Sequence, residues 1–220
     1  MSRRVTAGKR SATEILYNFH WILPGEAARS AQGLGRRFER LLREHEIRSL
    51  LNLRGEQPKY GWWRKEEQLC ERLGIARYDV TLDSRRLPMR EMLVALVDAF
   101  DAAKRPLLVK CSGGQDRTAL ASAIYLLQQR GWSALPDARL QFLRFPYLHF
   151  PKRGQKWLAQ FPIYGENAAL GRPIAEWIRN DYDQNAFAAW LRDKGMGDSF
   201  RGIFTLPWTP NRPRWRRIWN

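Results

Sequence analysis

The sequence predicts an α/β fold in which a mostly parallel sheet is flanked by helices and followed by a helical C-terminal extension. Short apolar runs alternate with stretches of helical spacing up to about residue 150. Beyond that point helical segments continue between Gly and Pro residues, and no strand pattern is clear. The 220 residues therefore divide into four parts: a flexible basic N-terminus (1–15), an α/β domain (16–150), a helical extension (151–205) and a Pro/Trp/Arg-rich tail (206–220).

The first half of the α/β domain contains three apolar runs that we expect to be strands. Residues 19–23 end at the turn signal Pro24-Gly25, residues 49–53 form a compact run typical of a buried strand, and residues 77–82 form the third. Helical spacing separates them, over residues 34–45 and again over residues 60–73 before Gly74.

The second half repeats the pattern with longer helices. Pro88 suits the first position of a helix, and the apolar residues that follow it fall on one face. Residues 107–109 form a short buried strand, and residues 117–130 form a helix that is apolar nearly all round and ends at Gly131. The extension is expected to contain helices near residues 153–161, 173–180 and 183–194.

The composition points to an anionic partner. The net charge is +16 and the isoelectric point is about 10.6, which suits a phosphorylated ligand, nucleic acid or an acidic membrane surface, or else a merely solvated basic surface. Two cysteines exclude a disulfide scaffold and favour a reducing compartment. Because the N-terminus lacks the pattern of a signal peptide and no segment approaches a membrane span, we expect a cytoplasmic protein that could be peripheral to the membrane.

A seven-residue loop, here called the cysteine loop, carries the most specific chemistry: Cys111-Ser112-Gly113-Gly114-Gln115-Asp116-Arg117. It follows an apolar strand and opens an apolar helix, where the helix dipole and a nearby cation can lower the pKa of a thiol. The two glycines allow backbone N–H groups to turn inward, and an arginine can close over a phosphate with a bidentate fork. The hydroxyl of Thr118 can hydrogen-bond a thiolate. The alternative is a buried, inert cysteine.

Residues 109–118 resemble the phosphate-binding loop of the protein tyrosine/dual-specificity phosphatase superfamily. The ending Asp116-Arg117-Thr118 is similar to bacterial members and to the myotubularins, and residues 23–32 and 47–54 look like the opening segments of atypical dual-specificity phosphatases. The resemblance covers roughly residues 18–150. It implies the cysteine phosphatase fold and hydrolysis of phosphate monoesters through a phosphocysteine intermediate, with no metal and no cofactor.

The resemblance also assigns roles to residues. Cys111 is expected to be the nucleophile and Arg117 to hold the phosphate, with Asp83 as the general acid because it directly follows the strand before the motif strand. Asp79 and Asp116 are alternative acids. Asp83 could instead serve only as a cap residue that precedes a helix. The expected substrate-binding residues are Ser112, Gly113, Gly114, Gln115, Asp116 and Thr118.

Two departures from the family pattern bear on reactivity and substrate. Lys110 stands where most members have a histidine, and it lowers the thiol pKa only if it points inward. Gln115 replaces a lysine seen in many phosphoinositide-directed loops. We therefore expect a phosphotyrosine or phosphoprotein substrate, with a phosphoinositide, lipid or inositol phosphate as the alternative. A silent phosphate-binding module and a basic nucleic-acid-binding protein are the rival classes, and nucleic acid is the less favoured partner.

Several other residues admit two interpretations. Cys70 suits a packed core or a resolving thiol for an oxidised Cys111. Arg85 and Arg86 could meet the substrate or be solvated loop charges. The histidines, His20, His45 and His149, show no metal spacing and are taken as structural or surface residues. The tail tryptophans Trp208, Trp215 and Trp219 alternate with Arg and Pro, which suits stapling onto the domain, an anionic membrane surface or single-stranded nucleic acid.

Overall fold

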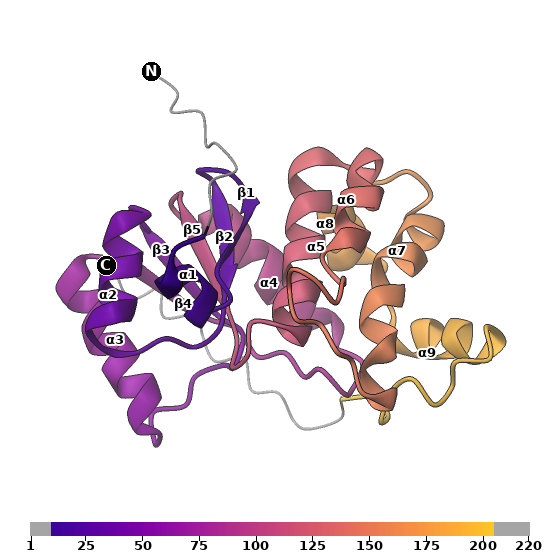
Figure 1. Cartoon of the computed structure of the whole chain (residues 1–220). Coiled ribbons are helices and arrows are strands. Elements are labelled where there is room, and N and C mark those ends of the chain that lie inside the picture. Colours follow the sequence, from indigo (N-terminus) through magenta and orange to yellow (C-terminus); the bar gives the residue numbers. More distant parts are fainter. Residues whose placement is uncertain (1–9, 205–220) are drawn as a thin grey trace.

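The computed structural model describes residues 10–204, and these form a five-stranded sheet between two layers of helices (Figure 1). The sheet order is β1-β2-β5-β3-β4, with β2, β5, β3 and β4 parallel and β1 antiparallel to β2. The prediction of a mostly parallel sheet with flanking helices is confirmed. The strand bounds are β1 His20–Leu23, β2 Ala27–Ser30, β3 Ser49–Asn52, β4 Ala76–Asp79 and β5 Leu107–Lys110.

Strand β2 has no counterpart in the sequence interpretation. Its residues Ala-Ala-Arg-Ser carry too little apolar character to indicate a strand. It forms because Gly25, at φ 74°, turns the chain back after β1, and because its other edge pairs with β5.

The carboxyl ends of the four parallel strands lie level with one another. The last residues pair across the sheet, Ser30 with Lys110, Lys110 with Asn52, and Asn52 with Asp79. The loops that follow these strands therefore meet at one edge, which is where open α/β sheets place their ligand sites.

One face of the sheet is covered by α2 (Gly35–Glu44) and α3 (Gly61–Leu73) (Figure 1). Helix α3 ends where the sequence indicated, at Gly74 with φ 65°. Cys70 is buried in this layer, as its core interpretation requires. The cluster there consists of Phe19, Ala28, Phe38, Leu41, Leu42, Ile47, Leu50, Leu69, Cys70, Ile75 and Leu108.

The other face is covered by α4 (Arg90–Ala102) and α5 (Asp116–Arg130). The expectation that Pro88 opens α4 is wrong by two residues: the helix begins at Arg90, after the extended residue Met89. Helix α5 is buried along most of its length, as its apolar sequence predicts, and the C-cap is Gly131. Because side chains alternate along a strand, Val109 faces this layer while Leu108 and Lys110 face α3.

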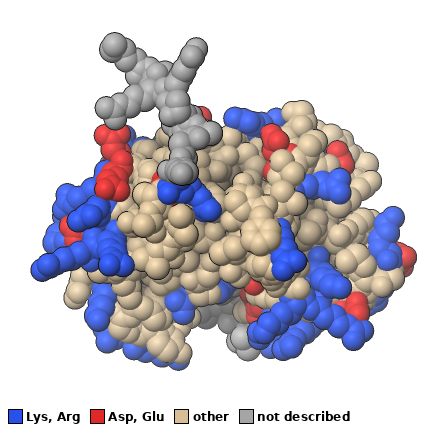
Figure 2. Space-filling view, in the orientation of Figure 1, with Lys and Arg blue, Asp and Glu red and all other residues tan. Residues whose placement is uncertain are grey.

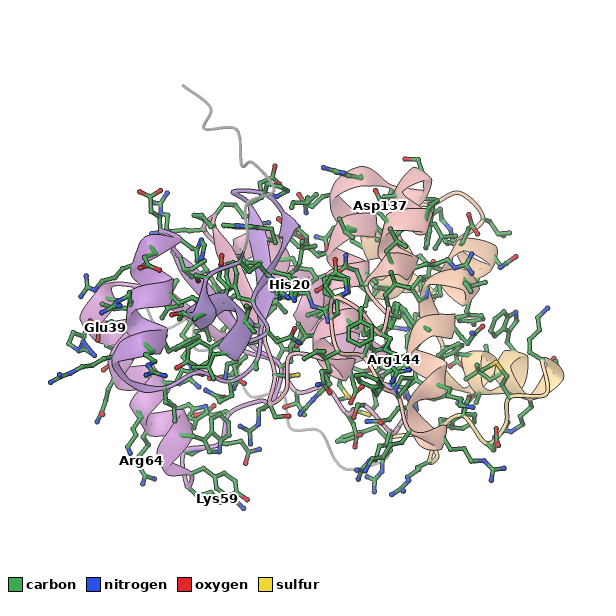
Figure 3. All side chains as sticks on the ribbon, in the orientation of Figure 1. His20, Glu39, Lys59, Arg64, Asp137 and Arg144 are labelled. Atoms are coloured by element: carbon green, nitrogen blue, oxygen red, sulfur yellow. The ribbon has the colours of Figure 1, made fainter. Side chains whose placement is uncertain are left out.

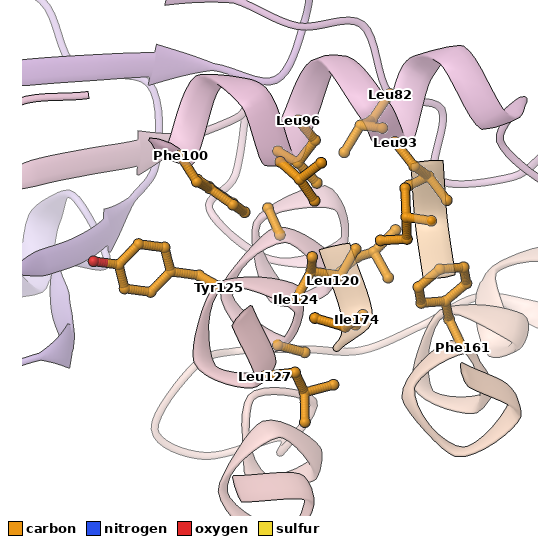
Figure 4. Packing of buried hydrophobic residues seen from close by; sticks show 14 of the residues in the cluster. Leu82, Leu93, Leu96, Phe100, Leu120, Ile124, Tyr125, Leu127, Phe161 and Ile174 are labelled. Atoms are coloured by element: carbon orange, nitrogen blue, oxygen red, sulfur yellow. The ribbon is translucent and has the colours of Figure 1, made fainter. Parts of the chain in front are cut away.

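The helices of the extension pack on α4 and α5 and share their core. Phe161 and Ile174 lie in one cluster with Leu93, Leu120 and Ile124 (Figure 4). The expected helical segments near residues 153–161, 173–180 and 183–194 are present. The elements after α5 are the 3₁₀ turn η1 (Trp132–Ala134), α6 (Leu135–Leu140), the 3₁₀ segment η2 (Arg153–Gln160), α7 (Phe161–Ala169), α8 (Ile174–Asn180) and α9 (Gln184–Asp193).

The ends of the chain bear on two expectations. Part of the N-terminal segment expected to be loose is helical: α1 (Ala12–Leu16) is capped by Ser11, whose side chain accepts from the backbone N–H of Glu14. The Trp/Arg tail, including Trp208, Trp215 and Trp219, lies outside the described residues. Within residues 10–204, no helix has both the length and the apolar character needed to cross a bilayer.

Candidate active site

The cysteine loop joins β5 to α5, at the sheet edge where the parallel strands end. Gly114 has φ 65°, and a Cβ there would lie 2.5 Å from the backbone nitrogen of Ala31. Only glycine fits that position without moving the chain. At Gly113 an added Cβ would meet only the side chain of Gln115, at 3.5 Å, so the structure makes Gly114 the indispensable glycine of the pair.

Cys111 lies with its thiol buried against the first turn of α5. Burial would raise the pKa of the thiol, but Arg117, the Thr118 hydroxyl and the backbone N–H groups of Gln115 and Thr118 outweigh it, so the pKa is lowered. The thiolate is therefore favoured although almost no solvent reaches it.

Arg117 turns back over the cysteine loop from the second residue of α5. Its Nη2 donates to Ser112 Oγ at 3.1 Å, which holds the guanidinium above the loop and partly open to solvent. The predicted pair, a thiolate and a guanidinium at the start of one helix, is therefore brought together.

Lys110 points away from Cys111, because neighbouring residues of a strand face opposite sides of the sheet. It is fully buried, with Nζ 2.6 Å from Glu66 Oε2 and 2.7 Å from Gln32 Oε1. Burial lowers the pKa of Lys110 to about 8, against the attraction of Glu66. Its role is to join the loop strand to α3, and Gln32 extends the connection by donating its backbone N–H to Ser112 O at 2.9 Å.

The outer side of the cysteine loop is supported by residues that the sequence interpretation missed. Because the loop N–H groups turn inward, its carbonyls need other donors. Fully buried Arg29 donates through Nη2 to Gly114 O at 3.1 Å and to Gln115 O at 3.3 Å, and Asn18 Nδ2 donates to Gly114 O at 3.3 Å. Burial lowers the pKa of Arg29 to about 10, so it stays charged at neutral pH. The only sequence signal was an arginine within a short, otherwise small-residue run.

Arg54 is a second arginine near the thiolate, and it too was not predicted. It follows β3, its guanidinium lies 3.6 Å from the centre of the Trp62 ring, and Nη1 donates to Gln32 Oε1 at 3.5 Å. Burial and the nearby Arg117 lower the pKa of Arg54, while the Cys111 thiolate raises it. The two arginines therefore act on the same small volume around the sulfur.

The three candidate acids occupy different environments. Asp79 accepts from Asn52 Nδ2 at 2.6 Å and pairs with Arg77, and burial raises its pKa. It lies on the α3 face of the sheet, the opposite face from Cys111. Asp83 is half-buried in the loop after β4, where Oδ1 accepts from the backbone N–H of Arg85 at 2.7 Å.

Asp116 holds the extension against the cysteine loop. Its Oδ2 accepts from Gln155 Nε2 at 2.8 Å, and Oδ1 lies 3.4 Å from His149 Nε2. Burial lowers the pKa of His149, which the sequence interpretation took only as a structural or surface residue. Gln155 Nε2 also donates to Ser84 Oγ at 3.0 Å, so the extension joins the Asp83 loop to the cysteine loop.

The two cysteines do not face each other in the fold. Cys70 lies on the α3 side of the sheet and Cys111 on the other side, so the sheet separates the two sulfurs. Burial raises the pKa of Cys70 to about 12.

Arg85 is exposed and Arg86 is half-buried. Among residues 10–204, no group of three His, Cys, Asp or Glu side chains could hold a metal ion.

The comparisons with known proteins agree with this geometry. Residues 16–141 match the family model described as Swiss Army Knife protein, DSP-PTPase phosphatase domain, and the chain belongs to this family. It is therefore a phosphatase of the protein tyrosine/dual-specificity class, and its substrate is an anionic phosphorylated molecule. A search of curated proteins found no match.

Solved structures are similar to this chain at low sequence identity. The G95A mutant form of Tk-PTP is 16% identical with a TM-score of 0.50, and the match covers 68% of this chain and 96% of Tk-PTP. The core catalytic domain of the PP-IP phosphatase SIW14 from S. cerevisiae, in complex with citrate, is 20% identical with a TM-score of 0.47, covering 81% and 93%. P. aeruginosa TpbA is 14% identical with a TM-score of 0.48, covering 80% and 92%.

Proposed function

We propose that the chain hydrolyses phosphate monoesters with Cys111 as nucleophile, Arg117 as phosphate-binding residue and Asp83 as general acid. The observation that carries the proposal is the convergence of a stabilised thiolate, a guanidinium and inward N–H groups at the start of α5. Ser112, Gly113, Gly114, Gln115 and Asp116 supply the backbone that surrounds the phosphate.

The proposed reaction has two steps. Cys111 Sγ attacks phosphorus, the bond to the leaving oxygen breaks, and Asp83 donates a proton to that oxygen. Water then attacks the phosphocysteine and gives its proton to Asp83, and inorganic phosphate leaves as the thiolate re-forms. The Thr118 hydroxyl, which favours the thiolate form of Cys111, supports the departing sulfur.

Asp83 is preferred over Asp116 because it follows the strand before the motif strand, as the family resemblance implies, whereas the Asp116 carboxylate already accepts a hydrogen bond from Gln155. Asp83→Asn should lower kcat/KM for phenyl phosphate by about 10²- to 10⁴-fold. The loss should be smaller for para-nitrophenyl phosphate, whose leaving group needs less protonation. A general acid acts in its protonated form, so the decline of kcat/KM at alkaline pH should also disappear. If Asp116→Asn produces these changes and Asp83→Asn does not, the assignment is wrong.

A phosphotyrosine or other phosphoprotein site is the first proposed substrate. Arg54 favours a second candidate, a phosphoinositide, phospholipid or inositol phosphate, because it adds a cation beside Arg117 that a further anionic group could meet. A screen over phosphopeptides, phosphoinositides and inositol phosphates, with wild type and Arg54→Gln, separates the two. Preference for phosphopeptides, unchanged in the variant, supports the first; preference for multiply phosphorylated ligands, lost in the variant, supports the second.

We also propose that the protein is cytoplasmic and makes peripheral contact with an anionic membrane surface. The support is the net charge of +16, which attracts the chain to anionic lipid headgroups.

A further inference from the structure

Residues 139–152, the end of α6 and the segment after it, expose an unusual number of large apolar side chains. Phe145 is 64% exposed and Phe150 is 49% exposed, and the two rings pack edge to face. Large apolar residues on a monomer are normally scattered, and a contiguous group marks an interaction surface. The exposed apolar residues of this segment are Leu140, Leu143, Phe145, Leu148 and Phe150, here called the apolar patch.

The charged residues of the segment that carries the apolar patch all have one sign. No acidic residue occurs between Asp137 and Glu166, whereas Arg139, Arg144, Lys152, Arg153 and Lys156 lie in that stretch. Within the described part of the chain, only Arg153 of these five forms an ion pair, with Asp198. The Arg144 guanidinium lies over the Phe150 ring, 4.6 Å from its centre.

The figures show where this surface lies. In the shared orientation, Figure 3 places Arg144 to the right of the centre of the molecule. Figure 2 shows a broad uncharged area across the centre of this face, with Lys and Arg side chains along much of its edge and a few Asp and Glu side chains among them. Apolar groups that are surrounded by cations suit a surface that is negative at its headgroups and apolar beneath them.

The same segment is fixed to the catalytic machinery on its inner side. Asn18 Nδ2, which supports the cysteine loop, also donates to Tyr147 O at 3.0 Å, and buried His149 lies beside Asp116. The residues between and beside these anchors, Phe145, Leu148 and Phe150, are exposed. A partner bound to the apolar patch is therefore held close to the active site.

We propose that the apolar patch and its surrounding basic residues form a docking surface for an anionic lipid bilayer. Charge complementarity selects this occupant. The N-terminal residues 1–9 contain Arg3, Arg4 and Lys9 with no acidic residue, and residues 205–220 contain four arginines with none. A second copy of the chain carries +16 as well. The two terminal segments and a second copy are therefore repelled by the basic residues around the apolar patch, whereas anionic headgroups are attracted to them. The inference deepens the proposed membrane contact and does not depend on the proposed chemistry.

The test is co-sedimentation of the full chain with lipid vesicles. Wild type should bind vesicles of phosphatidylcholine with phosphatidylserine and should not bind phosphatidylcholine alone. The double variant Phe145→Ser/Phe150→Ser should lose about tenfold or more in affinity, because two rings no longer enter the interface. Arg144→Gln should lose about fivefold, the effect of one basic residue near an anionic surface. Leu170→Ser, at the C-cap of α7 where the side chain is 83% exposed, is the matched control and should bind as wild type.

Hydrolysis of para-nitrophenyl phosphate separates this inference from the proposed function. All these variants should turn it over at the wild-type rate, which also shows that they fold. The docking proposal is overturned if wild type ignores the anionic vesicles, or if the double variant binds them as tightly as wild type. It is also overturned if the patch instead mediates a dimer in sedimentation velocity, or if replacing only the four tail arginines by Gln abolishes vesicle binding.

Discussion

Replacing Cys111 by Ser should reduce hydrolysis of para-nitrophenyl phosphate by at least about 10⁴-fold, the scale expected when a covalent nucleophile is removed. The site lowers the pKa of a thiol and so favours its anion, but the same donors cannot ionise a serine hydroxyl at neutral pH. Steady-state turnover of the purified chain measures the effect, and vanadate, which mimics phosphate, should inhibit wild type.

The matched control is Cys70→Ala. Cys70 is buried on the opposite face of the sheet, and burial raises its pKa to about 12, so its replacement should leave the turnover rate nearly unchanged. Retained turnover in Cys111→Ser would contradict the nucleophile assignment. Phosphate binding by wild type without any turnover would instead identify a silent phosphate-binding module.

Glu66→Gln should destabilise the protein by about 3–5 kcal/mol, the effect of leaving a buried charge without its partner. Glu66 is fully buried, pairs with Lys110 Nζ at 2.6 Å and with Arg77 Nη2 at 3.4 Å, and accepts from Gln32 Nε2 at 2.5 Å. The glutamine keeps the shape of the side chain but leaves the Lys110 cation uncompensated. Urea unfolding followed by tryptophan fluorescence measures the change. Turnover should fall as well, because Gln32 donates to the cysteine loop at Ser112.

Glu39→Gln is the matched control, since Glu39 also pairs with two basic residues, Arg43 and Arg72, but at the surface of α2. It should cost no more than about 1 kcal/mol. Adding Lys110→Met to Glu66→Gln should recover part of the lost stability, because no buried cation then remains. Equal effects of Glu66→Gln and Glu39→Gln, or no recovery in the double variant, would show that the pair does not hold the loop strand.

The parts of the site that the sequence predicted are local in the chain. Cys111, Arg117 and Thr118 lie within one strand, loop and helix, whose apolar runs and glycines can be read directly. The level strand ends also follow from a parallel sheet, which brings the Asp83 loop to the same edge. Strand β2 is the exception among the strands, because its pairing with β5 rather than its own composition makes it a strand.

The supports of the site could not be predicted, because they come from distant segments. Arg29 and Asn18 contact the cysteine loop from more than eighty positions away, and no pattern in either segment indicates a bond to a loop carbonyl. Alternation along β5 allows Lys110 to point away from Cys111, but only the packing of α3 identifies Glu66 as its partner. The hydrogen bonds of Gln155 to Ser84 and Asp116 likewise depend on where the extension packs.

The pH dependence of Cys111 alkylation tests most directly whether the start of α5 holds an anionic sulfur. Iodoacetamide reacts with the thiolate, so its rate follows the ionised fraction, and a Cys70→Ala background leaves one reactive thiol. Because the pKa of Cys111 is lowered, the rate should remain high as pH falls through the range in which an ordinary thiol becomes protonated. The midpoint should lie below that of free cysteine and move upward in Arg117→Gln. A midpoint at or above the free-cysteine value in wild type would contradict the account.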